Sequence, residues 1–371
     1  MLNLFKKNNI LDYIKNNNKT FEEANLNEVD SLIFATMMYT DFTGFISDKI
    51  DKYKFLMQGI DKLLKIPNEE FKKRTYYLED REFHKLMMNS ERFKFLNVSN
   101  FISIHDKEKD LQFASILIQI KKNEYQIAFE GTDYSVIGWR DTFDLGYRTS
   151  ASQKYAANYL NNVLKYLEGK HNKDFSCTLS GHSKGGNLAI YSATKVLSEY
   201  KKYIKTIYNF DGPGFEKAFL DENDYKEIEE KIVTIVPKGT FVAELLWHSG
   251  TFKVVDNKGI GLLQHVPYNF LLKDNNFLYM DKITWNDPLC DKGMKEWLNS
   301  LSYDEKKEFV DTIFKWMKDA NIDNLREVID PKTFTKLLQT IKNDSKEDKK
   351  FVANTLKLLF EKTFNALIEN K

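Results

Sequence analysis

The chain has 371 residues, of which 42% are hydrophobic and 14% aromatic, and 55 lysines and arginines balance 54 acidic residues to a formal charge of +1. A chain of this length can bury roughly three quarters of its unfolded surface, so a large core needs neither a metal nor disulfides. The balanced charge argues against a dedicated nucleic-acid-binding protein, and the apolar content against a disordered chain.

Cysteine usage and the N-terminus indicate the class of protein. Cys177 and Cys290 cannot form a disulfide framework, and neither has a Cys or His at zinc-finger spacing. The chain turns polar at Lys6, before the apolar stretch of a signal peptide could form. No apolar run approaches the roughly 20 residues of a membrane-spanning helix. We therefore expect a soluble, cytoplasmic globular protein without a metal site.

The first hundred residues have the pattern of helices separated by polar turns. Asn27 is a candidate N-cap, because apolar residues recur after it at helical spacing, at Val29, Leu32, Ile33, Met37 and Phe42. Residues 51–98 carry more helical pattern, mixed with Phe and Tyr. We expect residues 1–100 to form an N-terminal helical region.

The pattern changes near residue 101 to strands that alternate with helices. The β-rich runs 111–120 and 125–129 are joined by four polar residues, which predicts a hairpin. Later segments predict a helix at 153–167, a strand at 175–179, a helix from the glycine-rich turn to about residue 200, and strands at 204–210, 232–236 and 252–255. Such alternation indicates a mostly parallel sheet with helices on both faces, an α/β fold over residues 101–287.

The chain becomes helical again from Pro288. Ser302 and Glu305 have the spacing of a capping box, and residues 351–368 form a last amphipathic helix. No Gly-, Ser- or Pro-rich linker separates the three regions. We therefore expect one structural unit, with helical extensions at residues 1–100 and 288–371 around the α/β core.

Residues 181–185, Gly-His-Ser-Lys-Gly, fit the pattern G-x-S-x-G in the context that gives it meaning, with a strand before it and a helix after it. A tight strand-to-helix turn would project the Ser183 hydroxyl above the sheet. The Lys184 amide at the helix N-terminus would then face a developing oxyanion. We interpret Ser183 as a nucleophile, the alternative being a structural glycine-rich turn with an ordinary serine.

A serine nucleophile needs an imidazole base, which in α/β hydrolases follows the acid in chain order. His265 lies past the last strand candidate, where a catalytic loop is expected. His248 follows residues 242–247, which have the pattern of a helix. We favour His265, and we expect His182 to pack beneath the turn.

Two carboxylates compete as the acid of the triad. Asp211 ends a predicted strand before Gly-Pro-Gly, which would hold it at the carboxyl edge of the sheet. Asp256 ends the later strand 252–255. We favour Asp211, although an Asp at this position can also serve only to stabilise the turn.

Several segments together resemble a known family. Residues 129–133, Trp139, Asp141, Asp144 and residues 180–189 resemble the lipase class 3 type of α/β hydrolase. The closer resemblance is to a bacterial lipase-like family called Mbeg1-like, and it extends to residues 27–32, 90–93, 209–215 and 264–267. It covers about residues 9–290 and implies an α/β-hydrolase fold.

The resemblance also implies an oxyanion-hole partner for Lys184. Thr132, just after a core strand, would supply a second donor through its backbone, with its hydroxyl as a further candidate. Two positions depart from the family pattern, Glu130 where it usually has Arg and Val266 where it often has Asp. Class 3 lipases carry their acid in D-x-V-P, but residues 235–238 here contain no Asp, which again favours Asp211.

We therefore expect a lipase- or esterase-like serine hydrolase that cleaves a neutral ester or lipid, a small-molecule partner, without metal or organic cofactor. The alternative is a catalytically inactive lipid-binding or scaffold protein with the same fold. The N-terminal helices would form a cap over the acyl site or a plain layer on the sheet.

The last helix has a second possible role. Its apolar residues, with lysines between them, could lie on a membrane surface or pack against another subunit. We favour the simpler interpretation that this helix covers the core, because amphipathic helices mostly face a core.

Overall fold

The computed structural model describes residues 8–240, 242, 243, 245–280 and 296–369. In this part of the chain an eight-stranded sheet runs in sequential order from β1 to β8, with β1 to β4 antiparallel and β4 to β8 parallel. The strands are β1 Lys54–Phe55, β2 Asn97–Asp106, β3 Leu111–Lys121, β4 Glu124–Phe129, β5 Ser176–His182, β6 Ile204–Phe210, β7 Ile232–Pro237 and β8 Thr251–Val255. The predicted α/β-hydrolase-like fold, a mostly parallel sheet between helices, is confirmed.

Period-two alternation along β3 divides its side chains between two cores. Phe113 and Leu117 pack on one face of the sheet, and Ile116 and Ile118 pack on the other. All four are fully buried. The run was therefore recognisable as a strand by its continuous apolar character, which is typical of a sheet covered on both faces.

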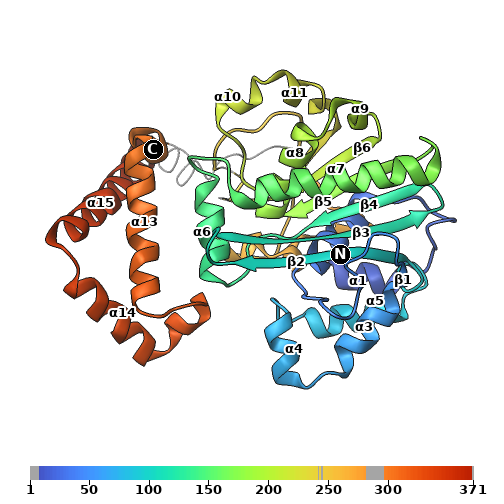
Figure 1. The fold of residues 1–371 in the computed structure, drawn as a ribbon, viewed down its shortest axis with the longest axis horizontal. Helices are drawn as coiled ribbons and strands as arrows, with labels where there is room; N and C mark the ends of the chain where they lie inside the picture. The colour runs from blue at the N-terminus through green and yellow to red at the C-terminus, as the bar shows by residue number, and fades with distance from the viewer. Residues whose placement is uncertain (1–7, 241, 244, 281–295, 370–371) are drawn as a thin grey trace, which may run out of the picture.

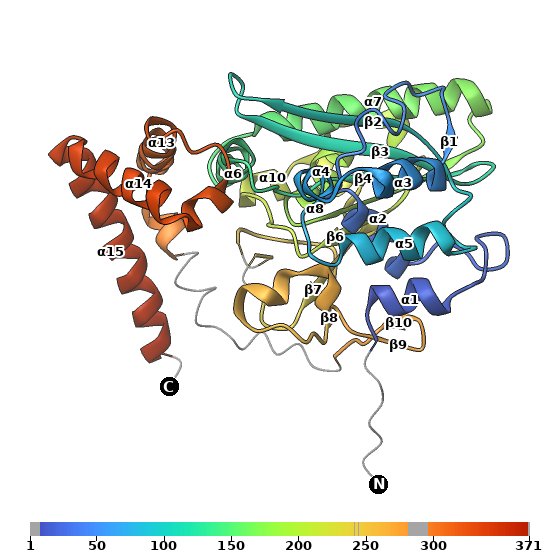
Figure 2. The same ribbon diagram turned by 90° about the horizontal axis from the view of Figure 1, so that it is seen from below.

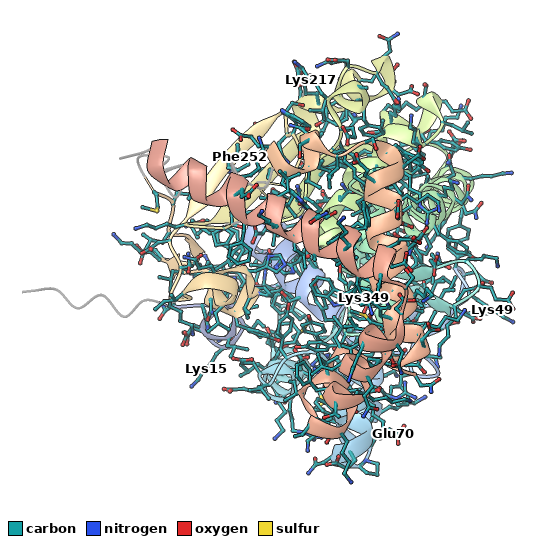
Figure 3. The ribbon with its side chains drawn as sticks, turned by 90° about the vertical axis from the view of Figure 1, so that its left-hand side faces the viewer. Lys15, Lys49, Glu70, Lys217, Phe252 and Lys349 are labelled. Atoms are coloured by element: carbon teal, nitrogen blue, oxygen red, sulfur yellow. The ribbon has the colours of Figure 1, made fainter. Side chains whose placement is uncertain are left out.

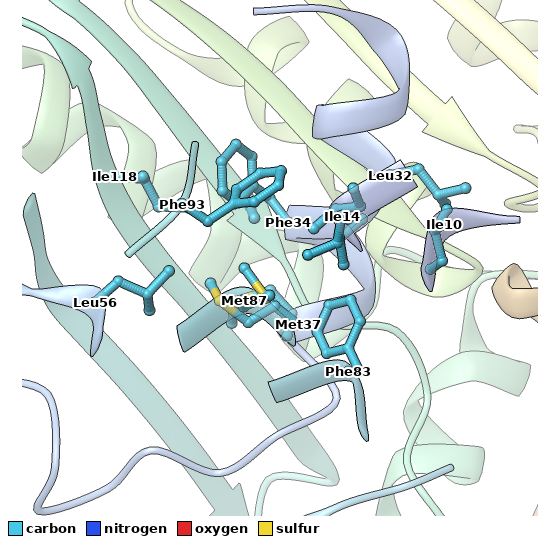
Figure 4. Close-up of a cluster of buried hydrophobic side chains, with 14 of the residues drawn as sticks. Ile10, Ile14, Leu32, Phe34, Met37, Leu56, Phe83, Met87, Phe93 and Ile118 are labelled. Atoms are coloured by element: carbon cyan, nitrogen blue, oxygen red, sulfur yellow. The ribbon is translucent and has the colours of Figure 1, made fainter. Parts of the chain in front are cut away.

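Helices cover both faces of this sheet (Figure 1). α7 (Ala151–His171) and α8 (Lys184–Lys195) lie on one face, where α7 packs on β3 and α8 on β5 and β6. The N-terminal helices lie on the other: α1 Ile10–Asn16, α2 Glu28–Met37, α3 Leu56–Lys65, α4 Asn68–Arg74 and α5 Asp80–Asn89. α2 crosses β4, β5 and β6, and Figure 4 shows its Leu32, Phe34 and Met37 among the buried side chains of this layer.

Three elements differ from the expectation. β1 and the first residues of β2 lie inside the region expected to be helical, and no strand was predicted at Asn97–Asp106. A bulge at Asn100, with φ of 51°, breaks the alternation of side chains that would have indicated β2. The helix expected at residues 242–247 is wrong for the residues described there. The backbone of Trp247 instead exchanges two hydrogen bonds with Phe215, of 2.9 and 3.0 Å, so long-range pairing overrides a helical apolar spacing.

The segments 27–32 and 90–93 are joined by a buried ion pair. Asn27 caps α2 as predicted, accepting hydrogen bonds from the amides of Val29 and Asp30. Arg92 donates from Nε and Nη2 to the two carboxylate oxygens of Asp30, at 2.8 and 2.6 Å, and both side chains are fully buried. Its remaining donors bind backbone carbonyls between Lys19 and Asn25. The pair therefore fixes the chain that leads into α2.

The C-terminal helices have a separate apolar cluster. α13 (Tyr303–Asp319) begins at the predicted capping box, and α14 (Pro331–Asn343) and α15 (Lys346–Glu369) follow it. Figures 1 and 2 show them beside α6 (Val136–Asp144), and Figure 3 shows them in front of the α/β core. Their cluster takes in side chains of α6 and the following turn: Val136, Trp139 and Tyr147.

The domain boundaries expected at residues 100 and 287 remain predictions. Pro288, where the C-terminal helical region was expected to begin, and Cys290 lie outside the described residues. Cys177 is buried. No helix in the described ranges is long and apolar enough to cross a bilayer.

Replacing Arg92 with Leu should lower the free energy of unfolding by about 3–5 kcal/mol, because Asp30 would keep a buried charge without its partner. Urea denaturation measures this loss. Lys65→Met is the control: its ion pair with Asp61 is exposed, so its removal should cost at most about 1 kcal/mol. Equal effects of the two changes would contradict the role given to the buried pair.

Candidate active site

The predicted site residues follow the carboxyl ends of neighbouring parallel strands. Thr132 comes after β4, Ser183 directly after β5 and Asp211 directly after β6. His265 ends a short 3-10 helix, η2 (Gly261–His265), that follows β8. Parallel strands bring their carboxyl ends to one edge of the sheet, which is where open α/β sheets hold their ligands.

The turn at Ser183 is strained and is permitted by glycines. Ser183 has φ of 57° and ψ of −133°, outside the regions that a residue with a side chain ordinarily adopts. A Cβ at Gly181 would lie 2.1 Å from the carbonyl carbon of Gly185, and a Cβ at Gly185 would lie 2.4 Å from the Phe129 carbonyl oxygen. Only glycines allow β4, β5 and α8 to approach so closely beneath the serine.

Asp211 and His265 are in direct contact. The Asp211 Oδ2 atom lies 2.6 Å from His265 Nδ1, and its Oδ1 atom accepts a 2.5 Å hydrogen bond from the Thr240 hydroxyl. Asp211 is fully buried, whereas the His265 side chain is 24% exposed. Because an ionised carboxylate only accepts, Nδ1 of His265 carries a proton, and Nε2 of the neutral ring is then free to act as a base.

The alternative residues lie in other surroundings. His248 Nε2 lies 2.6 Å from the Ala243 carbonyl oxygen, so this ring is held by its own loop. The Asp256 carboxylate accepts a hydrogen bond from the neighbouring Asn257 amide. Neither of these two hydrogen bonds involves Asp211 or His265.

His182, beneath the turn, supports the backbone of His265. Its Nε2 lies 2.7 Å from the His265 carbonyl oxygen, which can only accept, so Nε2 carries the proton. Burial and the nearby His265 lower the pKa of His182 well below its ordinary value, so the ring is neutral and its Nδ1 is an acceptor. The Tyr39 hydroxyl, 2.8 Å away, must then donate to Nδ1. The donor is thereby defined in both hydrogen bonds: Tyr39 donates to His182, and His182 donates to the His265 carbonyl.

The two expected oxyanion donors are placed by different elements. Lys184 is the first residue of α8, so its N–H is among those at a helix N-terminus that lack an intrahelical acceptor. The Lys184 side chain is fully buried and donates to the Asp141 carboxylate at 2.9 Å and to the Gln112 carbonyl at 2.8 Å. The ion pair between Lys184 and Asp141 thus joins the Ser183 turn to α6.

The hydroxyl of Thr132 is already engaged. It lies 2.5 Å from the Thr142 hydroxyl, which itself donates to the Gly138 carbonyl at 2.8 Å. A hydroxyl has one proton, so Thr132 donates to Thr142. The sequence suggested both the backbone N–H and the hydroxyl of Thr132 as oxyanion donors, and only the backbone N–H remains a candidate.

Glu130 is buried next to this loop. Burial, and to a lesser degree the nearby Asp133, raises the pKa of Glu130 well above its ordinary value, against the opposing effect of Lys184. Gln112 donates a 2.7 Å hydrogen bond to its carboxyl group. These surroundings favour the neutral acid, so Glu130 adds little negative charge beside the loop that carries Thr132.

Sequence reasoning missed the second layer of the site. Thr240 and Tyr39 lie in loops after β7 and α2 and carry no motif, and their partners are far away in sequence. Tyr76 and Tyr77, which pack on the Tyr39 ring, belong to the stretch noted only as rich in aromatic residues. The described residues contain no group of three or more His, Cys, Asp or Glu side chains that could hold a metal ion.

Comparisons with known proteins extend this description. The Mbeg1-like family model matches residues 87–315. No curated protein matches the chain.

Among solved structures, three lipases show distant likeness. M37 lipase is 17% identical, with 59% of this chain and 70% of that chain covered and a TM-score of 0.38. The Rhizomucor miehei lipase–propeptide complex is 14% identical, with 47% and 66% covered and a TM-score of 0.33. Lipase II from Rhizopus niveus is 12% identical, with 47% and 69% covered and a TM-score of 0.33.

His182 should make the protein less stable in acid. Its pKa is lowered in the folded state, so its contribution is complete above the unfolded-state pKa of about 6.5. Below that pH the unfolded chain takes up a proton that the folded chain does not, and stability falls. His182→Gln should therefore lose less free energy of unfolding than wild type between pH 7.5 and pH 5, as measured by urea denaturation.

His84 provides a companion variant, because burial lowers its pKa to about 4. His84→Gln should reduce the loss of stability in acid in the same way. Variants that keep the full wild-type pH dependence would show that these rings are not the groups responsible.

Proposed function

The chain belongs to the Mbeg1-like family, and from that premise and the site geometry we propose that it is a serine ester hydrolase of the lipase or esterase type. The observation that carries the proposal is the 2.6 Å contact between His265 and the buried Asp211, at the sheet edge where Ser183 stands on a strained turn. Strain of this kind is typical of functional residues.

In the proposed reaction the Ser183 hydroxyl oxygen attacks the ester carbonyl carbon, and His265 Nε2 accepts its proton. The same imidazolium then donates that proton to the leaving alcohol. Water, deprotonated in turn by His265, attacks the acyl carbon; the bond to the Ser183 oxygen breaks, that oxygen takes the proton back from His265, and the acid is released. Asp211 holds the ring in the productive tautomer and stabilises its positive charge, and Thr240 fixes the carboxylate.

The proposed oxyanion hole consists of the backbone N–H groups of Lys184 and Thr132. The N-terminal end of α8 adds its partial positive charge at the same place. The buried Lys184 ammonium is held in an ion pair with Asp141, so the backbone rather than the side chain of Lys184 would contact the oxyanion.

The proposed substrate is a neutral ester or lipid. The Tyr39, Tyr76 and Tyr77 rings beside the site would offer an apolar wall to an acyl chain, and the proposed chemistry requires no cofactor. Location in the cytoplasm and contact of the last helix with a membrane remain predictions.

A fluorophosphonate probe should label the wild-type chain at Ser183, and the protein should hydrolyse short and medium nitrophenyl esters. Ser183→Ala should abolish labelling and lower kcat by at least about 10³-fold, because it removes the nucleophile. Labelling is followed on a gel with a fluorescent probe. An unlabelled wild type that binds fatty acid would favour the lipid-binding alternative, and equal turnover by Ser183→Ala would contradict the proposal.

Asp211→Asn should lower kcat by about 10³- to 10⁴-fold with little change in KM, because an amide can donate to Nδ1 and so favour the wrong tautomer of His265. Asp256→Asn is the matched control, since Asp256 follows the neighbouring strand β8, and it should retain activity near that of wild type. Ester hydrolysis measured for both variants assigns the acid, and the reverse ranking would identify Asp256.

A further inference from the structure

The loop that carries Thr132 is held from outside by the C-terminal extension. The Leu325 N–H donates to the Tyr134 carbonyl at 2.8 Å, and the Val136 N–H donates to the Asp323 carbonyl at 2.9 Å. Leu325 begins η4 (Leu325–Ile329), the short 3-10 helix between α13 and α14. Two backbone hydrogen bonds thus attach this segment to the chain just after Thr132.

Arg326 reinforces this attachment by stacking. Its guanidinium carbon lies 3.7 Å from the centre of the Tyr134 ring, and the Tyr134 ring stacks on Tyr76 at 3.9 Å with planes 8° apart. Arg326 Nη2 also donates to the Tyr76 carbonyl at 2.8 Å. Arginine suits such a position because its planar group stacks and donates at once, which lysine cannot do.

The ring contacts continue towards His265, the proposed catalytic base. Tyr76 packs on Tyr39 with ring centres 5.0 Å apart, and the Tyr39 hydroxyl donates to His182, which holds the His265 carbonyl. The His182 and His265 rings are 4.4 Å apart. Each step in this series is a ring contact or a hydrogen bond.

Tyr39, a member of this series of contacts, also touches the loop that carries Thr132. A Cβ added at Gly131 would lie 2.0 Å from the Tyr39 hydroxyl oxygen, so this hydroxyl lies directly against the loop. The loop between β4 and α6 therefore contacts Tyr39 at Gly131 and Arg326 at Tyr134, on either side of Thr132 in the sequence.

The other ionic contacts of the extension are weaker candidates for this role. Lys107 and Asp323 form an ion pair at 2.7 Å, but both side chains are about two-thirds exposed. Such pairs contribute little in water. Arg140 pairs with Asp311, but it lies within α6, beyond the loop. Arg326 is the contact that joins the loop, the Tyr76 segment and the extension.

We propose that Arg326 is a positioning residue for the hydrolysis reaction: it attaches the C-terminal extension to the oxyanion loop and, through Tyr134, Tyr76, Tyr39 and His182, to the catalytic base. This inference rests on the proposed function. Arg326 does not touch the reacting atoms. It sets the geometry of the groups that stabilise the transition state, so its loss lowers kcat and leaves KM nearly unchanged.

The test compares Arg326→Ala and Arg326→Lys in the full chain, with Lys336→Ala, an exposed residue of α14, as control. Arg326→Ala should lower kcat on a nitrophenyl ester and the rate of fluorophosphonate labelling about tenfold, with KM within about twofold. Arg326→Lys should restore little, because it keeps the charge and loses the planar stack. Lys336→Ala should match wild type.

Hydrogen exchange provides a readout that does not depend on activity. Amides of residues 132–136 should exchange faster in Arg326→Ala than in wild type or Lys336→Ala, while those of α7 and α8 stay protected. Faster exchange throughout the protein, or a loss of kcat matched by a fall in Tm, would show a merely structural role and overturn the proposal.

The outcomes separate this inference from the proposed function. An active wild type with an equally active Arg326→Ala overturns the positioning role alone, as does a rise in KM with kcat unchanged. A wild type that is neither labelled nor active overturns the proposed function and, with it, any role of Arg326 in the reaction.

Discussion

The close approach of three backbones beneath Ser183 is the constraint on which the rest of the site depends. Gly181 and Gly185 let the end of β5 and the start of α8 touch each other, and Gly185 also touches the end of β4. This contact places the Thr132 loop next to the Ser183 turn. The same turn forces Ser183 into a conformation that a side chain disfavours, and the surrounding sheet and helix must hold it there.

Two fully buried cations, Lys184 and Arg92, are paired with carboxylates, and each pair links separate elements. Lys184 joins α8 to α6 through Asp141 and to β3 through Gln112. Arg92 joins the N-terminal segment to α2 through Asp30. Burying an ion pair adds little net stability, but breaking one is costly, so these pairs specify one arrangement of the layers rather than strengthen it.

The sequence allowed most of the fold to be predicted because its signals are local. Short runs rich in β-branched, aromatic and other apolar residues indicated β3 to β8, and the G-x-S-x-G turn lay between a strand and a helix as expected. Asp211 and His265 were placed by chain order, and their contact fits that interpretation. The errors have two causes. The pairing of Trp247 with the distant Phe215 replaced a predicted helix, and the bulge at Asn100 broke the alternation that would have indicated β2.

The supporting residues could not be predicted, for the same reason. Tyr39, Thr240 and Arg326 belong to three separate segments outside the sheet and the long helices, and each contacts a partner remote in sequence. The contact of residues 323–326 with Tyr134 has a consequence for the order of synthesis. A ribosome completes Thr132, Ser183, Asp211 and His265 long before it reaches Arg326. A nascent chain would therefore have every proposed reacting group while the proposed support of the Thr132 loop is still missing, so we expect full activity only after residues 323–326 are made.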